Sequence, residues 1–155
     1  MSTQLSETIT LEQATFSATA QRLGIDNSVT DPEMLTTLKY TAARFERVSL
    51  LLMRQVHIDS MYRCLELNRA LGSSDKSQHV KGQAVDFICP EFGTPMDIVK
   101  KLSGYAELLD FDQLIQEFGW VHISFIPTGG RRQILTLLKN KHYAVGITDP
   151  DGNPA

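Results

Sequence analysis

A run of apolar residues at helical spacing between residues 34 and 52 is the feature that most restricts how this chain folds. Asp31 is a suitable N-cap for a helix there, and Pro32 suits the first turn. The apolar side chains recur every three or four residues and would share one face: Met34, Leu35, Leu38, Ala42, Phe45, Val48 and Leu52. Such a face must pack against other elements, so we predict that this helix forms part of the core.

Shorter helices and strands are predicted around this helix. Thr10 and Gln13 form a capping pair for a first helix that runs to about Arg22. The other expected elements are strands at 55–58 and 83–89, helices at 64–72 and 94–102, and a β-hairpin at 111–125. A loop without periodicity is expected at 72–82, and no repeat is present.

Length and composition indicate one domain. A chain of 155 residues, 42% of them hydrophobic, is long enough for a single core. The order of the elements predicts the α+β class: a small single domain, 1–155, with a central, mainly antiparallel sheet flanked by helices. Residues 1–9 and 149–155 are expected to be flexible tails.

Charge and hydropathy argue against several partners. The formal charge of -3 does not favour nucleic-acid binding, and the basic cluster Arg131, Arg132, Lys139 and Lys141 is interpreted as a solvated surface. No apolar run approaches the ~20 residues needed to insert into a membrane, and the polar start "MSTQLSETIT" is unlike a secretory signal. We expect a monomer made in a cytoplasm.

The stretch "SQHVKGQAVDF" places a histidine and an aspartate where a polar loop enters a strand. Alternation along 83–89 puts Asp86 on the face opposite the apolar Val85 and Phe87. His79 lies in the loop, and Gly82 allows a turn that brings the imidazole toward the carboxylate. Two such residues are weak support for a metal site without a third.

The hairpin at 111–125 supplies a third candidate ligand. If its loop is Phe118-Gly119, Glu117 lies opposite Trp120 and Ile115 lies opposite His122. Glu117 and His122 are then diagonal neighbours on one face. Three ligands beside a carboxylate base are what a zinc hydrolase requires. Each residue also has a plain structural interpretation: a structural histidine, a solvated glutamate, a core tryptophan.

The motifs in combination resemble a known family. "SQHVKGQAVDF" followed by "WVHISF" is similar to the zinc-dependent peptidoglycan peptidases that include D-Ala-D-Ala carboxypeptidases and the L-Ala-D-Glu peptidases of phage endolysins. The family pattern, Ser-x-His-x-x-Gly-x-Ala-x-Asp with a later His, is present in full. "SMYRCLELNRALGSSDKSQH" and "SATAQRLGIDN" resemble the phage-type branch, so the likeness extends from about Leu11 to Phe125.

The resemblance implies roles for individual residues. It makes His79, Asp86 and His122 the ligands of one Zn²⁺ ion carried by the sheet. It also implies Arg63 as an anchor for a substrate carboxylate and Ser77 as a loop or substrate contact. Trp120 is predicted as a further substrate-binding residue. Ser77 is equally interpreted as a turn-forming serine.

The chain departs from the family pattern at two positions. Met61 stands where glycine is common, and Gly119 occupies the position, three residues before the last histidine, where many relatives carry the catalytic acid. Glu117 is therefore predicted as the general base, because the hairpin places it on the face of His122. Asp112 is the alternative, although on a regular strand it would face away from Glu117.

The predicted function is zinc-dependent hydrolysis of the stem peptides of bacterial peptidoglycan. The resemblance implies a phage-type endolysin that is made in the host cytoplasm and acts on the periplasmic cell wall after release. The alternatives are a D-Ala-D-Ala carboxypeptidase or dipeptidase acting on wall precursors, and a non-catalytic zinc-containing virion or binding module.

Overall fold

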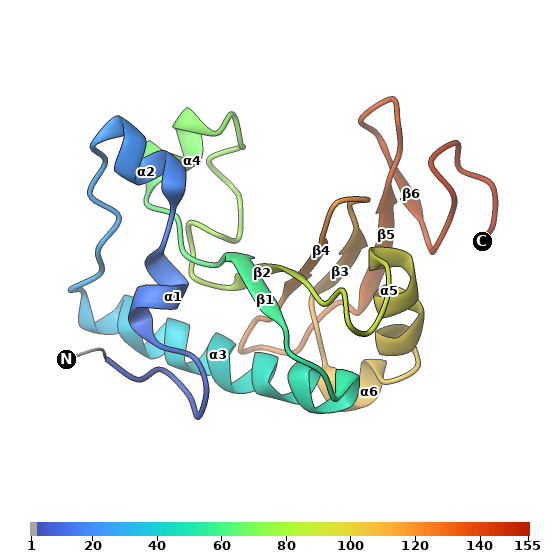
Figure 1. Ribbon diagram of the computed structural model, residues 1–155, viewed down its shortest axis with the longest axis horizontal. Coiled ribbons are helices and arrows are strands. Elements are labelled where there is room, and N and C mark those ends of the chain that lie inside the picture. Colours follow the sequence, from blue (N-terminus) through green and yellow to red (C-terminus); the bar gives the residue numbers. More distant parts are fainter. Residues whose placement is uncertain (1–2) are drawn as a thin grey trace.

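The computed structural model describes residues 3–155, which form six helices and six strands (Figure 1). The strands make one sheet in the order β1-β2-β4-β3-β5-β6. The helices are α1 (Leu11–Thr15), α2 (Ala18–Leu23), α3 (Pro32–Leu52), α4 (Leu65–Ala70), α5 (Pro95–Ser103) and α6 (Ala106–Leu109). The strands are β1 (His57–Ser60), β2 (Ala84–Ile88), β3 (Gln113–Gln116), β4 (Val121–Ser124), β5 (Gln133–Leu137) and β6 (Tyr143–Val145).

Helix α3 confirms the predicted apolar stripe. The Asp31 side chain accepts a hydrogen bond from the Met34 N–H, and Pro32 occupies the first turn. Five of the stripe residues are buried: Leu38, Ala42, Phe45, Val48 and Leu52. The remaining two, Met34 and Leu35, pack against the same core while partly exposed. Helix α3 lies beneath the sheet and extends below most of the width of the sheet (Figure 1).

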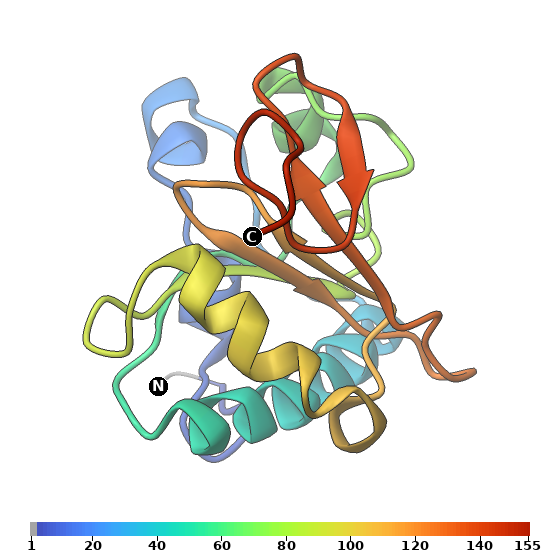
Figure 2. The same cartoon turned by 90° about the vertical axis from the view of Figure 1, so that its right-hand side faces the viewer.

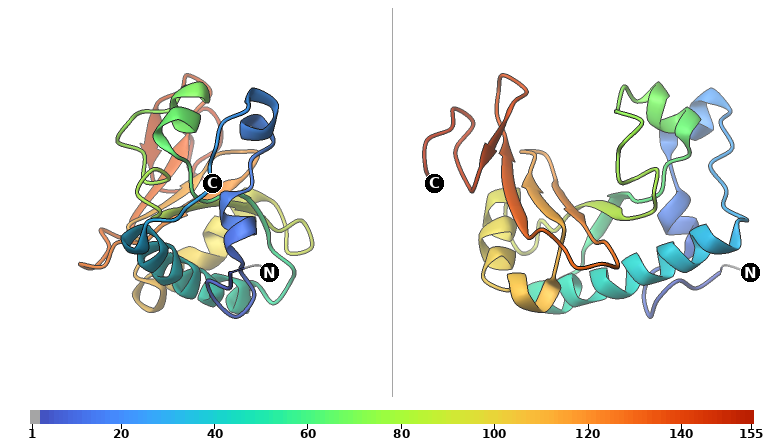
Figure 3. Two further views of the ribbon diagram at one scale, coloured as in Figure 1. Left: turned by 90° about the vertical axis from the view of Figure 1, so that its left-hand side faces the viewer. Right: turned by 180° about the vertical axis from the view of Figure 1, so that it is seen from behind.

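The sheet has one apolar face and one polar face. Helices α3 and α5 pack against each other on the apolar side (Figure 2), together with buried strand residues Val85, Phe87, Leu114, Val121 and Ile123. On the other side, helices α2 and α4 rise at one end of the sheet and the β5–β6 hairpin rises at the other (Figure 3). The polar face is left open between them.

The predicted first helix is wrong in its length, because two short helices replace it. The capping box of Thr10 and Gln13 is present and starts α1. Phe16 then adopts an extended conformation, and the Ser17 side chain accepts a hydrogen bond from the Ala20 N–H to start α2. Ser17 is thus a second N-cap inside the predicted helix, and a serine in that role favours a new start over continuation.

The sheet is mixed, which corrects the expectation of a mainly antiparallel one. Strand β5, which the sequence did not predict, pairs parallel with β3. The chain leaves β4 and returns beside the start of β3, where Gly130 passes so close that a Cβ would lie 2.0 Å from the Phe111 oxygen. The Arg132 N–H then donates to that oxygen at 2.9 Å. Starting there, β5 must run in the direction of β3.

Both ends of the described chain have defined contacts. A bridge joins Gln4 to Thr10, and Leu5 and Ile9 belong to the core, although 1–9 was expected to be a tail. At the other end, 149–155 folds into a turn in which the Asp149 carboxylate accepts two backbone hydrogen bonds. Residues 1 and 2 lie outside the described part. Among the helices of residues 3–155, none combines the length and the hydrophobicity of a membrane-spanning segment.

Candidate active site

Strand β2 supplies the acidic residue of the site. Val85 and Phe87 point into the core, so Asp86 points to the polar face as the alternation predicts. Asp86 is the direct partner of His122 in the antiparallel pairing of β2 with β4. Directly paired residues share a face. The Asp86 Oδ1 atom consequently lies 2.9 Å from His122 Nδ1.

The loop before β2 brings His79 to the same point. The Ser77 Oγ accepts a hydrogen bond from the His79 N–H at 3.3 Å, which shapes the turn. Gly82 has a φ of +70°, and a Cβ there would lie 2.7 Å from the Met34 sulfur. A glycine therefore allows both the turn and the close approach to α3. The chain folds back, and His79 Nε2 lies 3.1 Å from Asp86 Oδ2.

The hydrogen bonding of His79 tests whether the site fits a metal. Its Nδ1 atom lies 2.7 Å from the Met61 carbonyl oxygen, which only accepts, so Nδ1 carries the proton. The buried Nε2 atom then presents a lone pair, and it has no hydrogen-bond partner among residues 3–155. Its contact with Asp86 is close but does not have hydrogen-bond geometry. An unshared lone pair held toward a carboxylate fits a cation.

The donor set as a whole fits a divalent ion such as zinc. Ligand atoms of His79, Asp86 and His122 all lie within 4.8 Å of one another. Burial alone would raise the pKa of Asp86, but the neighbouring imidazoles of His79 and His122 hold it well below its ordinary value. The aspartate is therefore an anion at neutral pH. Two imidazoles and one carboxylate are a ligand set used by catalytic zinc sites.

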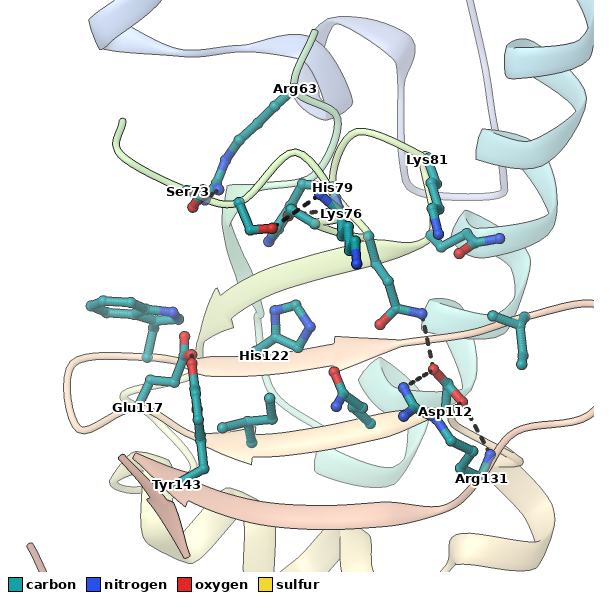
Figure 4. A pocket seen from close by; sticks show the side chains of 18 of the residues that line it. Arg63, Ser73, Lys76, His79, Lys81, Asp112, Glu117, His122, Arg131 and Tyr143 are labelled. Carbon is teal, nitrogen blue, oxygen red and sulfur yellow. Dashed lines mark hydrogen bonds and ion pairs between the residues drawn. The ribbon is translucent and has the colours of Figure 1, made fainter. Parts of the chain in front are cut away.

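Glu117 shares an open cleft with these residues. The cleft has a volume of about 890 Å³ and lies on the polar face of the sheet (Figure 4). The predicted hairpin register is present: Ile115 pairs with His122, and the Glu117 N–H donates to the Trp120 oxygen at 3.1 Å. Glu117 consequently faces the cleft beside His122. The geometry is that of a metal-ligand cluster with an adjacent carboxylate.

Comparison with known proteins identifies the family. Residues 7–124 match the family model described as peptidase M15. The match covers more than half of the 155 residues and includes the ligand cluster and Glu117. The chain belongs to the peptidase M15 family. The predicted resemblance to the zinc peptidase family of D-Ala-D-Ala carboxypeptidases is thereby confirmed. No curated protein matches the chain.

The pKa of Glu117 is raised in this M15 peptidase. Burial is the main cause, and the nearby charge of Asp86 adds to it. The charge of His122 and polar contacts with the Trp120 and Tyr143 side chains act in the opposite direction. A carboxylate with a raised pKa holds a proton more readily, which suits a group that must accept a proton and later return it.

Asp112, the alternative base, uses both carboxylate oxygens in hydrogen bonds with neighbouring residues. Its Oδ1 atom accepts hydrogen bonds from the Nε and backbone N–H of Arg131, at 2.9 and 3.1 Å. Its Oδ2 atom accepts from Arg131 Nη2 at 2.8 Å and from Gln78 Nε2 at 2.9 Å. Figure 4 shows this cluster at the end of the cleft opposite Glu117. These bonds, the one from the Arg131 side chain above all, lower the pKa of Asp112, so it is a poor proton acceptor.

The ion pair between Asp112 and Arg131, with its hydrogen bonds, is expected to stabilise the fold, so its removal should lower stability. Asp112→Ala is expected to lower the free energy of unfolding by about 1–3 kcal/mol, because charge-assisted hydrogen bonds are lost and Gln78 loses its partner. Urea denaturation at neutral pH measures this. As a control, Asp75→Ala removes an exposed carboxylate paired with Arg69 and should cost much less. Equal effects of the two substitutions would contradict the structural role of Asp112.

The same ion pair predicts that the stability of the fold depends on pH. Folding lowers the pKa of Asp112 below its ordinary value of 3.8, so the stabilisation is complete above that value and is lost as the pH falls through the lower folded-state pKa. The difference in unfolding free energy between the wild type and Asp112→Asn should therefore shrink in acid. A difference that stays constant from neutral pH to pH 2 would contradict this assignment.

The predicted substrate-binding residues all line the cleft, with different surroundings. The Arg63 guanidinium donates to Ser60 Oγ at 3.1 Å and lies 3.4 Å from Asp86 Oδ2. Ser77 supports the loop through the His79 N–H, as its turn-forming interpretation holds. Trp120 is 38% exposed at the rim and is not a core residue. Their roles toward substrate stay predictions.

Several residues of the cleft escaped the sequence analysis. Arg131 was assigned to a solvated basic cluster and its side chain is indeed exposed, but it also pairs with Asp112 at one end of the cleft, which was not predicted. Lys76 and Lys81 in the loop and Tyr143 on β6 also line it. A lysine beside a ligand motif was visible in the sequence, whereas nothing in the sequence connected Tyr143 to Glu117. Met61, which replaces the glycine common in the family, fits the structure. Its side chain is buried in the core, and its carbonyl oxygen accepts the hydrogen bond that orients His79.

Proposed function

We propose that this M15 peptidase hydrolyses peptide bonds in the stem peptides of bacterial peptidoglycan, with zinc as cofactor and Glu117 as general base. The observation that carries the proposal is the unshared lone pair of His79 Nε2. The Met61 carbonyl orients the imidazole ring through Nδ1, so that this lone pair is directed at Asp86. Glu117 lies on the same cleft beside His122. A ligand cluster with a nearby base, opening on a cleft, is the arrangement of a hydrolase.

The residues of the chain divide the chemistry between them. When bound, zinc supplies Lewis acidity, which polarises a carbonyl and makes water more acidic. His79, Asp86 and His122 would hold the ion, and the two strands fix the last two of these residues. Glu117 accepts a proton from the attacking water and passes it to the leaving amine. The raised pKa of Glu117 favours the first of these transfers, because a carboxylate with a higher pKa binds a proton more tightly.

The charge of the cleft supports an anionic substrate. The whole chain has a formal charge of -3, yet the cleft is lined by four basic residues, Arg63, Lys76, Lys81 and Arg131, against the acids Asp112 and Glu117. Within residues 3–155, neither lysine takes part in an ion pair. Peptidoglycan stem peptides carry free carboxylates, which such a surface attracts.

Mass spectrometry of purified peptidoglycan after incubation with the zinc-loaded protein tests the proposal. We expect new stem-peptide fragments from cleavage within the stem, and none after treatment with a chelator. This product pattern would support the phage-type lysin. Release of terminal D-Ala alone would instead establish a carboxypeptidase. No product at all from a zinc-containing protein would establish a non-catalytic module.

Arg63 is proposed to anchor a substrate carboxylate. A guanidinium offers a planar fork of donors, which lysine lacks, so Arg63→Lys is expected to lower kcat/KM by about 10- to 100-fold with unchanged zinc content. The exposed Arg22 on α2 provides a matched control as Arg22→Lys. Steady-state kinetics and elemental analysis decide the point. Loss of zinc in Arg63→Lys would show that the contact with Asp86 supports the metal ligand and not the substrate.

A further inference from the structure

The C-terminal β5–β6 hairpin brings a tyrosine to the proposed base. Strand β5 pairs in parallel with β3, with Gln116 opposite Thr136. Strand β6 pairs with β5, with Leu137 opposite Tyr143. Tyr143 is therefore aligned with Glu117, the residue after Gln116, across the strands of the sheet. Both residues lie at the same end of these strands. Residues aligned across a sheet share a face, so Tyr143 is directed to the cleft side.

The contact between the two side chains is direct. The Tyr143 hydroxyl lies 3.4 Å from Glu117 Oε1, and it donates because a carboxylate only accepts. Figure 4 shows the tyrosine ring standing beside the glutamate at one wall of the cleft. Tyr143 as a whole is about half exposed, as expected for a residue on an edge strand. Its hydroxyl nevertheless ends on the carboxylate.

The Glu117 side chain needs such a partner. Its backbone is held by the hairpin, but three rotatable bonds separate that backbone from the carboxylate. Within residues 3–155, the Tyr143 hydroxyl donates a hydrogen bond to the Glu117 side chain, which also has a polar contact with the Trp120 side chain across the turn. A general base acts only when its carboxylate stays within reach of the proton that it takes.

We propose that Tyr143 is a positioning residue, which holds the Glu117 carboxylate toward His122 from a strand outside the segment that matches the family. The matching segment ends at residue 124, whereas Tyr143 lies in the hairpin that follows. The inference rests on the proposed function, since it assigns a role around the base of that reaction. It adds the β5–β6 hairpin to the active site.

The first test uses the metal-free protein and does not depend on activity. Trp120 is the single tryptophan of the chain, so its indole N–H gives one signal in a ¹H–¹⁵N spectrum. Tyr143→Phe keeps the ring and removes the hydroxyl. It is expected to shift or broaden this signal through the released carboxylate, and to have little effect in the Glu117→Gln background. Tyr105→Phe, at an exposed tyrosine beside α6, is the matched control.

The outcomes of this first test are distinct. A change in the indole signal that requires Glu117 supports the positioning role. Equal changes in both backgrounds would show that Tyr143 acts through packing alone, and no change in either would show that the hydroxyl does not hold the carboxylate. Either result overturns the inference.

The second test measures hydrolysis by the zinc-loaded protein. Loss of one hydrogen bond to the base is expected to lower kcat by about 3- to 10-fold in Tyr143→Phe, with KM and zinc content unchanged. In the Glu117→Gln background the same change should cost nothing further, because residues that act as a unit are not additive. An unchanged kcat would overturn the inference. A wild-type protein without hydrolysis would refute the proposed function, and the spectra of the metal-free protein would still decide the role of Tyr143.

Discussion

Glu117→Gln is expected to lower kcat by about 10²- to 10⁴-fold, the usual contribution of a general base. Glutamine has nearly the shape of glutamate but accepts no proton at neutral pH. Glu117 is not among the three ligands, so zinc content and thermal stability should stay near the wild-type values. Single-turnover cleavage of a purified stem peptide, with zinc measured in the same sample, checks both parts of this prediction.

The control for this substitution is an exposed glutamate far from the cleft. Glu107 on α6 is exposed and does not line the cleft, so Glu107→Gln should cleave at the wild-type rate. If Glu117→Gln also cleaves at that rate, Glu117 has no part in proton transfer. Loss of zinc together with activity would point to a role for Glu117 in holding the metal, which the geometry of the ligand cluster does not require.

His122→Ala is expected to abolish stoichiometric zinc binding. Catalytic zinc sites use three protein ligands, and the two that would remain, His79 and Asp86, leave the ion weakly held. In the wild type, zinc at 100 times its dissociation constant should stabilise the fold by about 2.7 kcal/mol through linkage. Thermal unfolding with and without zinc, together with elemental analysis, measures both effects.

His57→Ala is the matched control for the metal prediction. His57 is exposed on β1 and lies outside the ligand cluster, so its removal should leave one zinc per chain and the same thermal shift. Full zinc retention in His122→Ala would refute the ligand assignment. A thermal shift in that variant as large as in the wild type would refute it equally.

The sequence predicted the parts of the site that depend on local periodicity. Alternation along β2 separated Asp86 from the core residues on either side of it, and a two-residue turn placed Glu117 opposite Trp120. Both rules act over a few residues, so no knowledge of the rest of the fold was needed. The long helix followed from its apolar stripe for the same reason.

The sequence did not predict features that depend on which strands become neighbours. The direct pairing of Asp86 with His122 joins segments 36 residues apart, and the parallel pairing of β5 with β3 depends on the path of the connecting loop. Pairings of this kind are decided by the packing of the whole domain and leave no local signature. Tyr143 was missed because its contact with Glu117 follows from that parallel pairing.

Holding His79 through the carbonyl oxygen of Met61 affects how this site can vary in evolution. Every amino acid at position 61 supplies the same oxygen, so no substitution removes the group that orients the imidazole. The side chain at that position is limited only by the volume available in the core, where it is fully buried. Selection on the proposed metal site would therefore act on the path of the backbone after β1. A residue that orients a ligand in this way would look unimportant in a comparison of aligned homologues, even though the chemistry depends on its position.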